Sequence, residues 1–232
     1  MKKNLLSIIL LLVFNNLYSQ YNEKVTYGIK VSALHSSISN LPEMIIGRDN
    51  SFAYYSIDSK GYYGLEAGFF LNYKVPDSRV AIQPEILYRN SGENVDYSNN
   101  SGKEYKLQLK YSYLQIGAFY KIYPIKGANL GVGAFYGLNL TPNNLDYTSN
   151  EANGKYDIEN RQFFRDGISG RNDLSVSFIL GYELEKSIHF DARYYFGVSD
   201  VIESRDASFK FIENTNRSNL FALSIGYSFD KW

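Results

Sequence analysis

The 232-residue sequence contains no cysteine. A secreted protein of this sequence has no disulfides, so a large core, a closed barrel or a bilayer has to stabilise it. Attachment of a lipid through a cysteine is excluded for the same reason. The 24 Lys and Arg residues equal the 24 Asp and Glu residues in number, so the formal charge is +0. This balance removes the case for a nucleic-acid partner.

Beyond its first residues the sequence also lacks a long apolar run. A membrane-spanning helix needs about 20 such residues, and the mean hydropathy of the chain is -0.31. A helical membrane protein is therefore excluded. The run from Leu5 to Phe14 is too short to span a bilayer, and it follows Lys2 and Lys3. We interpret residues 1–19 as a cleavable signal peptide and residues 20–232 as one domain.

Aromatic residues and alternation are what the sequence has in abundance. It contains 22 Tyr and 15 Phe residues, and such residues favour β-strands. Every even-numbered residue from Leu174 to Leu184, and again from Ile188 to Val198, is apolar or aromatic. Period-two alternation places these residues on one face of a strand. The pattern predicts a long β-hairpin.

Similar alternation marks eight segments, each of which reaches the roughly 9–11 residues that a tilted transmembrane strand needs. The segments are 25–35, 62–75, 80–90, 105–122, 129–140, 173–184, 188–199 and 219–229. Short turns follow the second, fourth and sixth segments, whereas long polar loops follow the first, third, fifth and seventh. Bacterial outer-membrane barrels alternate short periplasmic turns with long extracellular loops in this way. We predict an all-β fold, an eight-stranded antiparallel transmembrane β-barrel with up-and-down order, in the outer membrane with both termini periplasmic.

Charged residues share one face of the predicted strands. A Lys or Arg that faces lipid at the bilayer midplane costs about 2–4 kcal/mol, so the charged face must point into the barrel. Buried charges require partners, and we expect ion pairs between Glu66 and Arg89 and between Asp191 and Arg193. The predicted interior ion-pair plug consists of Lys30, Glu66, Glu85, Arg89, Lys121, Glu183, Asp191 and Arg193.

Two strands contain irregular features. The apolar parity of the fourth segment changes near Tyr113, which predicts either a β-bulge or the end of the membrane band. Pro84 removes one ladder donor from the third segment, so we expect a bulge or an irregular point there. The register of the fourth and fifth segments places Phe119 opposite Gly133 and Gly117 opposite Phe135, with the aromatic rings over bare glycines.

The last segment ends in a row of outward aromatic and aliphatic residues. Such rows resemble the signal by which barrel-assembly machinery takes up outer-membrane proteins, so we expect that machinery to be a partner during insertion. The row consists of Phe221, Leu223, Ile225, Tyr227 and Phe229.

Five segments carry motifs that occur together in one order along the chain: Gly28 to Lys30, Ile82 to Tyr88, Leu180 to Glu183, Asp191 to Gly197 and Gly226 to Phe229. In this order they resemble the PorT-like outer-membrane β-barrel family of Bacteroidetes. Tyr113 to Gly117 departs from the family pattern, where Leu-Glu-Ile-Pro is usual. The resemblance implies an eight-stranded barrel of the OmpA or OmpX type. The namesake of the family belongs to the type IX secretion and gliding apparatus.

Three sets of residues were weighed as candidates for chemistry. Glu183, His189 and Asp191 form a possible acid-base set inside the barrel, but the interior of eight strands holds only its own side chains. His35, Ser36 and Ser37 lie at the height of the catalytic His and Ser of outer-membrane lipid hydrolases. The acidic residues within 142–171 lack the spacing of a calcium loop. We therefore expect no enzyme activity, cofactor or metal.

We expect the protein to be a structural or accessory barrel with a filled lumen. Its expected partners are outer-membrane lipid and other envelope proteins. Partners of the second kind would bind the loops 36–60 and 142–171, as in a secretion or envelope complex. A narrow pore and a lipid-modifying enzyme are the alternatives.

Overall fold

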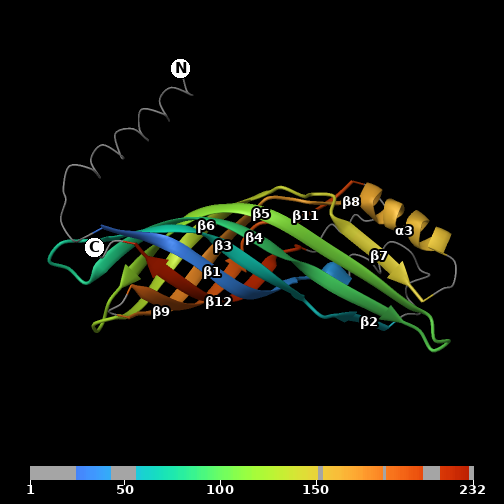
Figure 1. The fold of residues 1–232 in the computed structure, drawn as a ribbon. Helices are drawn as coiled ribbons and strands as arrows, with labels where there is room; N and C mark the ends of the chain where they lie inside the picture. The colour runs from blue at the N-terminus through green and yellow to red at the C-terminus, as the bar shows by residue number, and fades with distance from the viewer. Residues whose placement is uncertain (1–24, 43–55, 151–153, 185–186, 206–214, 230–232) are drawn as a thin grey trace, which may run out of the picture.

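The computed structural model describes residues 25–42, 56–150, 154–184, 187–205 and 215–229, and the predicted signal peptide lies outside these ranges. No helix in these ranges is long and apolar enough to cross a membrane. The elements are β1 (Val25–Ile38), β2 (Ser56–Ser59), β3 (Tyr62–Lys74), β4 (Val80–Ser98), β5 (Glu104–Ile122), β6 (Ala128–Asn139), β7 (Leu145–Ser149), α3 (Gly154–Gly167), β8 (Ile168–Gly170), β9 (Asp173–Glu183), β10 (Ile188–Gly197), β11 (Ile202–Ser204) and β12 (Ser218–Ser228) (Figure 1).

Eight of the described strands close into an antiparallel ring. The order is β1, β3, β4, β5, β6, β9, β10 and β12, and β12 pairs with β1. Each strand pairs with the next along the ring, which confirms the predicted barrel and its up-and-down order. The ring strands overlap all eight predicted segments. Val25 pairs with Tyr73, beside the turn that follows β3, and the Ser228 N–H donates to the Ser187 carbonyl in the turn between β9 and β10. The start of β1 and the end of β12 therefore lie at the end of the barrel that carries the short turns.

The register fixes the tilt of the strands. Following paired residues around the ring from Tyr63 leads back to β3 at Tyr73, ten residues farther along the same strand. This offset is about 33 Å along the strands, against about 38 Å for eight strand spacings, so the strands tilt by about 41°. The corresponding backbone radius is about 8 Å, a width that side chains can fill.

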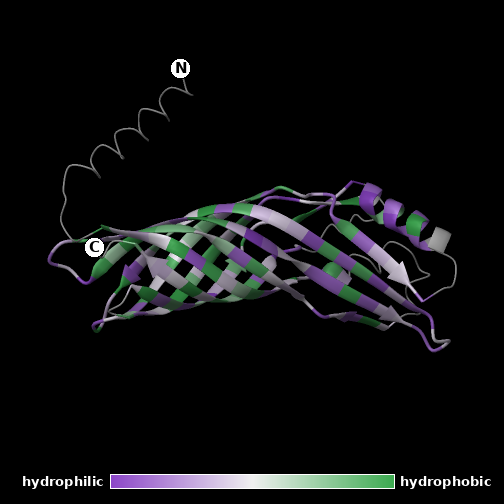
Figure 2. Cartoon of the chain, viewed as in Figure 1, coloured by the Kyte–Doolittle hydropathy of each residue, from purple (hydrophilic) through white to green (hydrophobic). Residues whose placement is uncertain are grey.

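Hydrophobic and hydrophilic residues alternate along the ring strands (Figure 2). The exposed side chains of these strands are mainly apolar and form a band around the outside of the ring. Tyr63 and Tyr73 mark its two limits on β3, and with the tilt derived above their separation along the barrel axis is about 25 Å, the height of the apolar band in outer-membrane barrels. Aromatic side chains gather near both limits, as in a membrane-interface girdle. The exposed aromatics near the limits include Tyr63, Tyr88, Tyr136, Phe196 and Phe221 toward the long-loop end, and Tyr27, Tyr120, Tyr182, Tyr227 and Phe229 toward the short-turn end. Phe69, Phe178, Phe190 and Tyr194 are exposed as well.

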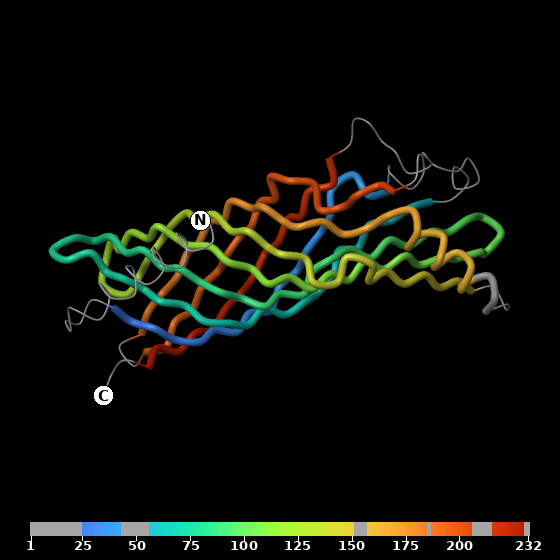
Figure 3. The backbone as a smooth tube through the Cα atoms, turned by 90° about the horizontal axis from the view of Figure 1, so that it is seen from above, coloured from blue at the N-terminus to red at the C-terminus, as the bar shows by residue number. Residues whose placement is uncertain are grey.

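Beyond the band, β4 and β5 continue as one long hairpin (Figure 3). Their pairing is unbroken from Val80 with Ile122 to Ser98 with Glu104, so the predicted bulge near Tyr113 is wrong. Odd-numbered residues of β5 are buried on both sides of Tyr113. What changes near Tyr113 is which face of β5 carries the apolar residues. Beyond the membrane no lipid covers the outer face, so the apolar residues occupy the inward positions there. This agrees with the alternative prediction that the band ends near Tyr113.

A second structured region lies beyond the band, and we call it the distal unit. It comprises β2, β7, α3, β8, β11 and the parts of β4 and β5 beyond Asn90 and Tyr113. Most of this region falls in segments predicted as loops, and β4 ends at Ser98, eight residues beyond the predicted end of the third strand at residue 90. The buried apolar core of the distal unit consists of Ile38, Leu41, Val95, Tyr97, Tyr105, Leu107, Leu109, Tyr111, Tyr113, Leu145, Tyr147, Phe164, Ile168, Val201 and Ile202.

Pro84 lies at an interruption of one ladder and not at a bulge. It pairs with Ala118 of β5. The ladder between β3 and β4 is interrupted between two of its pairs, Phe70 with Glu85 and Tyr73 with Ile82. The register is the same on both sides of the interruption. Pro84 therefore removes hydrogen bonds locally without inserting a residue.

The predicted contacts between aromatic rings and glycines are present in the lumen. A Cβ atom added at Gly117 would lie 2.3 Å from both the carbonyl oxygen of Ala134 and Cδ1 of Phe135. The Phe135 ring has little room to move, because it packs on Phe119 at 4.9 Å and on Tyr195 at 5.5 Å.

We predict that Gly117→Ala lowers the free energy of unfolding by about 1–3 kcal/mol, the usual cost of overpacking. Gly226→Ala is the matched control, because a Cβ there meets no atom closer than 3.4 Å. Its expected effect lies within about 1 kcal/mol of zero. Denaturant unfolding of the two variants in lipid vesicles tests the difference, and equal losses would contradict it.

Candidate functional site

A buried ion-pair network occupies the middle of the lumen. Its centre is Glu85 on β4, whose carboxylate binds Lys30 of β1 and accepts from Arg193 of β10 at 2.7 and 3.0 Å. Arg193 also donates to Asp191 at 2.9 Å, so the predicted pair between these two residues is present. The side chains of Lys30, Glu85 and Arg193 are at most 1% exposed. Three strands that are not neighbours are thus joined across the barrel.

A second cluster closes the short-turn end. Glu183 accepts a hydrogen bond from Lys74 at 2.8 Å and another from Tyr123, and Lys121 lies 3.8 Å away. Lys121 in turn donates to Gln83 at 2.9 Å, and Gln83 donates to Glu85 at 2.5 Å. The cluster is therefore connected to the central network through Gln83.

A third cluster lies toward the distal unit. Glu66 and Arg89 are opposite in the register, as predicted. The guanidinium of Arg89 nevertheless donates to Asp173 at 2.6 Å, whereas Glu66 accepts from Ser32 at 3.0 Å and from Tyr195 at 3.5 Å. The predicted Glu66–Arg89 ion pair is thus replaced by an Arg89–Asp173 pair. The barrel is narrow enough for the Arg89 side chain to reach Asp173 on β9, which is not a neighbour of β4, as easily as Glu66 on the adjacent strand β3.

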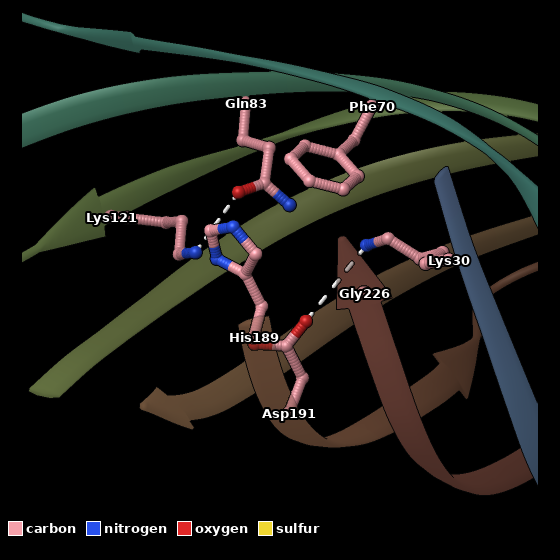
Figure 4. A pocket seen from close by; sticks show the side chains of 7 residues that line it. All are labelled: Lys30, Phe70, Gln83, Lys121, His189, Asp191 and Gly226. Carbon is pink, nitrogen blue, oxygen red and sulfur yellow. Dashed lines mark hydrogen bonds and ion pairs between the residues drawn. The ribbon is translucent and has the colours of Figure 1, made fainter. Parts of the chain in front are cut away.

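The network leaves little free space. Figure 4 shows a small hollow at the level of Lys30, Gln83, Lys121, His189 and Asp191, and it has no room for a water molecule. Among the described residues, no three His, Cys, Asp or Glu side chains gather to hold a metal ion. All eight residues of the predicted plug face the lumen, and seven of them are buried, with Glu183 half-buried at its end.

The order of groups around His189 is that of a hydrolase triad. Its Nε2 lies 2.5 Å from the hydroxyl of Ser228, and its Nδ1 lies 3.8 Å from Glu183. The second distance exceeds hydrogen-bond reach, and Glu183 already accepts from Lys74 and Tyr123. Ser228 is only 4% exposed. His189 therefore lacks the hydrogen bond to a carboxylate that completes such a triad.

His35 and Ser36 lie on opposite faces of β1. The Ser36 hydroxyl points inward and donates to the Gly92 carbonyl at 2.9 Å, whereas His35 faces outward against Tyr63, with ring centroids 4.8 Å apart. A His35–Ser36 catalytic pair is therefore ruled out by geometry. Ser37 shares the outward face with His35.

Sequence reasoning missed four residues that hold this interior together: Lys74, Gln83, Glu93 and Asp173. Asp173 belongs to the inward parity of a predicted strand, so the alternation itself could have found it. Glu93 lay beyond the predicted end of its strand. Its buried carboxylate accepts from the backbone N–H of Ile38 at 2.7 Å and of Gly61 at 2.5 Å, and so ties β1 and the start of β3 to β4.

The predicted assembly row lies on the outer face of the end of β12. Phe221, Leu223, Ile225, Tyr227 and Phe229 are 47, 57, 55, 48 and 37% exposed. The row therefore lies exposed on the outside of the barrel.

Comparison with solved structures lists small outer-membrane barrels. Neisserial surface protein A gives 12% identity and a TM-score of 0.44, covering 89% of this chain and all of that one. Ail of Yersinia pestis gives 11% identity and a TM-score of 0.40, covering 90% and 100%. OprG of Pseudomonas aeruginosa gives 14% and 0.35, covering 90% and 97%. A search of curated proteins finds no match.

The family comparison is independent of these structures. Residues 18–203 match the family described as outer membrane protein beta-barrel domain. The match covers well over half of the chain, and the closed ring of eight strands agrees with it. The chain is an integral outer-membrane β-barrel protein and belongs to the outer membrane protein beta-barrel domain family.

Proposed function

We propose that the protein is an accessory component of an envelope complex, in which a sealed barrel anchors a rigid binding platform outside the cell. The platform is the distal unit, and the end of the barrel with the short turns faces the periplasm. One observation carries the proposal: the distal unit has a buried apolar core of its own, separate from the barrel interior. Solvated loops do not need such a core, whereas a surface of fixed shape does.

The filled lumen supports an anchoring role over transport. Its charges are paired across the barrel, from Lys30 and Arg193 to Glu85 and from Arg89 to Asp173. A conducting path would require several of these pairs to separate, which is costly for buried charges. The carboxylates of Glu85 and Asp173 are engaged in these pairs, and the role that we propose is non-enzymatic.

The resemblance to PorT-like barrels supports a secretion or envelope complex as the setting. Lipid would contact the apolar band, and the barrel-assembly machinery would engage the Phe221 to Phe229 row during insertion. Other envelope proteins would bind the distal unit.

Photo-crosslinking in the native membrane tests the partner. A photoreactive residue at Ile158, which is 64% exposed on α3, or at Lys106 on the outer face of β5 is expected to give a discrete adduct. The same residue at Leu223 in the apolar band is the control and should not give that adduct. An absence of adducts from every exposed position of the distal unit would contradict the proposal.

The pore alternative makes an opposite prediction. We expect wild-type protein to give no stepwise conductance in planar bilayers, because the Glu85 network blocks the lumen. Regular steps from wild-type protein that change on substitution of Arg193 would establish a pore instead.

A further inference from the structure

The distal sheet ends at β7, whose two edges differ. One edge pairs with β5, from Tyr105 with Ser149 to Leu109 with Leu145. The other edge faces α3. A strand edge presents a row of backbone N–H and C=O groups that can pair with another strand, and proteins commonly cover such edges.

Three side chains of α3 bind this edge at regular intervals. Arg165 Nε donates to the Leu145 carbonyl at 2.8 Å, Arg161 Nη2 donates to the Tyr147 carbonyl at 3.2 Å, and Asp157 accepts from the Ser149 N–H at 3.2 Å. The three are four residues apart, which is about 6.0 Å along a helix. Their partners are two residues apart, which is about 6.6–6.8 Å along a strand. The helix thus matches the strand edge step for step, in the antiparallel direction.

α3 also fills the apolar position that a further strand would occupy. Phe164 is 1% exposed, and its ring stacks on Tyr147 with centroids 5.6 Å apart and planes at 22°. It belongs to the core of the distal unit, together with Leu145 and Tyr147. Side chains of one helix therefore replace both the hydrogen bonds and the inward side chain of a missing strand.

We propose that the outer edge of β7 is a strand-addition site for an extended segment of a partner protein, and that α3 closes it. The site would take a segment whose backbone donates to the carbonyls of Leu145 and Tyr147 and accepts from the Ser149 N–H. An aromatic or large aliphatic side chain of the segment would replace Phe164. This inference rests on the proposed function, for which it names a docking mode and a control.

The contacts of α3 are suited to displacement. The side chains of Arg161, Arg165 and their common ion-pair partner Asp146 are 33, 37 and 43% exposed. Exposed ion pairs are weak because water screens them. A helix of 14 residues is marginal without tertiary contacts. Among the described residues of α3, Phe164 is buried in the apolar core and Phe163, which is partly buried, packs against it.

Three states of the purified full-length protein in nanodiscs test the inference. The closed variant is Ser149→Cys with Asp157→Cys, in which a disulfide locks α3 on β7. The side-chain oxygens of these two residues lie 2.5 Å apart, and the sequence contains no cysteine of its own. The open variant is Arg161→Gln with Arg165→Gln, which weakens the contacts of α3 with β7. Gln162→Ala with Asp166→Ala is the control, because this exposed pair, joined at 2.8 Å, does not bind β7.

The probe is a fluorescent peptide with the sequence of Glu104–Lys110, the segment that already pairs antiparallel with β7. We expect the open variant to bind it at least tenfold more tightly than wild type in fluorescence anisotropy. The locked protein should not bind it until the disulfide is reduced, and the Gln162/Asp166 control should match wild type. A peptide with Pro in place of its central Leu should bind to none of them.

Equal binding by the open, locked and reduced proteins, or no binding by the open and reduced ones, would overturn the inference. The locked and reduced states are the same folded chain, so misfolding cannot mimic the difference. The peptide assay requires no native partner. Its failure alongside successful photo-crosslinking would remove the docking mode and leave the proposed function intact.

Discussion

Replacing Glu85 by Gln is expected to lower the free energy of unfolding by about 3–5 kcal/mol, the usual cost of removing one partner from a buried ion pair. The side chain keeps its size but loses its charge. Lys30 and Arg193, both buried, then share Asp191 as their remaining carboxylate partner within the described network. Denaturant unfolding in lipid vesicles measures the change.

Two further variants show whether charge pairing is the cause. Lys30→Met combined with Glu85→Gln leaves Arg193 with Asp191 and should recover at least half of the loss. Asp96→Asn breaks the Lys60–Asp96 pair at the surface. Its N–O distance of 2.6 Å is close to the 2.7 Å between Arg193 and Glu85, but its side chains are 56 and 26% exposed. Asp96→Asn should cost less than about 1 kcal/mol. Equal losses for Glu85→Gln and Asp96→Asn would show that burial does not govern these pairs.

Leu109→Ala is expected to unfold the distal unit while the barrel remains folded. Leu109 is fully buried in the distal core, where a Leu→Ala change costs about 2–5 kcal/mol. The barrel core of Leu34, Phe119, Phe135, Ile179, Tyr195, Leu220 and Ala222 shares no residue with it. Limited proteolysis should therefore remove the distal unit, and the remaining barrel should still migrate differently with and without boiling in detergent gels.

Lys106→Ala on the exposed face of the same strand is the control and should leave the distal unit resistant to protease. Loss of the barrel together with the distal unit after Leu109→Ala would show that the two cores fold as one.

The barrel could be predicted from the sequence because lipid and a narrow lumen impose opposite chemistry on alternate residues. The alternation placed Phe119 opposite Gly133 and Gly117 opposite Phe135, and the structure has both pairs. Parity describes neighbours along the wall, however. The partners of Glu85 lie on β1 and β10, across an interior about 8 Å in backbone radius, and no sequence pattern reports which side chains meet there.

The distal unit was harder to predict, because the rule that marks strands reverses beyond the membrane. Val95 and Tyr97 continue the inward parity of Glu85 and Arg89, but as apolar residues facing a protein core. The pattern of charged inward residues therefore ends before β4 does. The sequence of α3 is rich in charged residues, and this composition is typical of a loop. Its contribution of Phe164 to the distal core is not marked by any pattern in the sequence.

Paired side chains fill the barrel, and the reactivity of a single introduced cysteine tests this filling. Ser177 is fully buried, and its hydroxyl donates to the Tyr194 carbonyl at 3.1 Å inside the lumen. Ser177→Cys introduces a single thiol of similar size. In folded protein this thiol is expected not to react with a water-soluble thiol reagent, whereas it should react after unfolding, and Thr148→Cys on the exposed distal surface should react at once. Rapid reaction of Ser177→Cys in the folded barrel would mean that water fills the lumen, and would contradict the account.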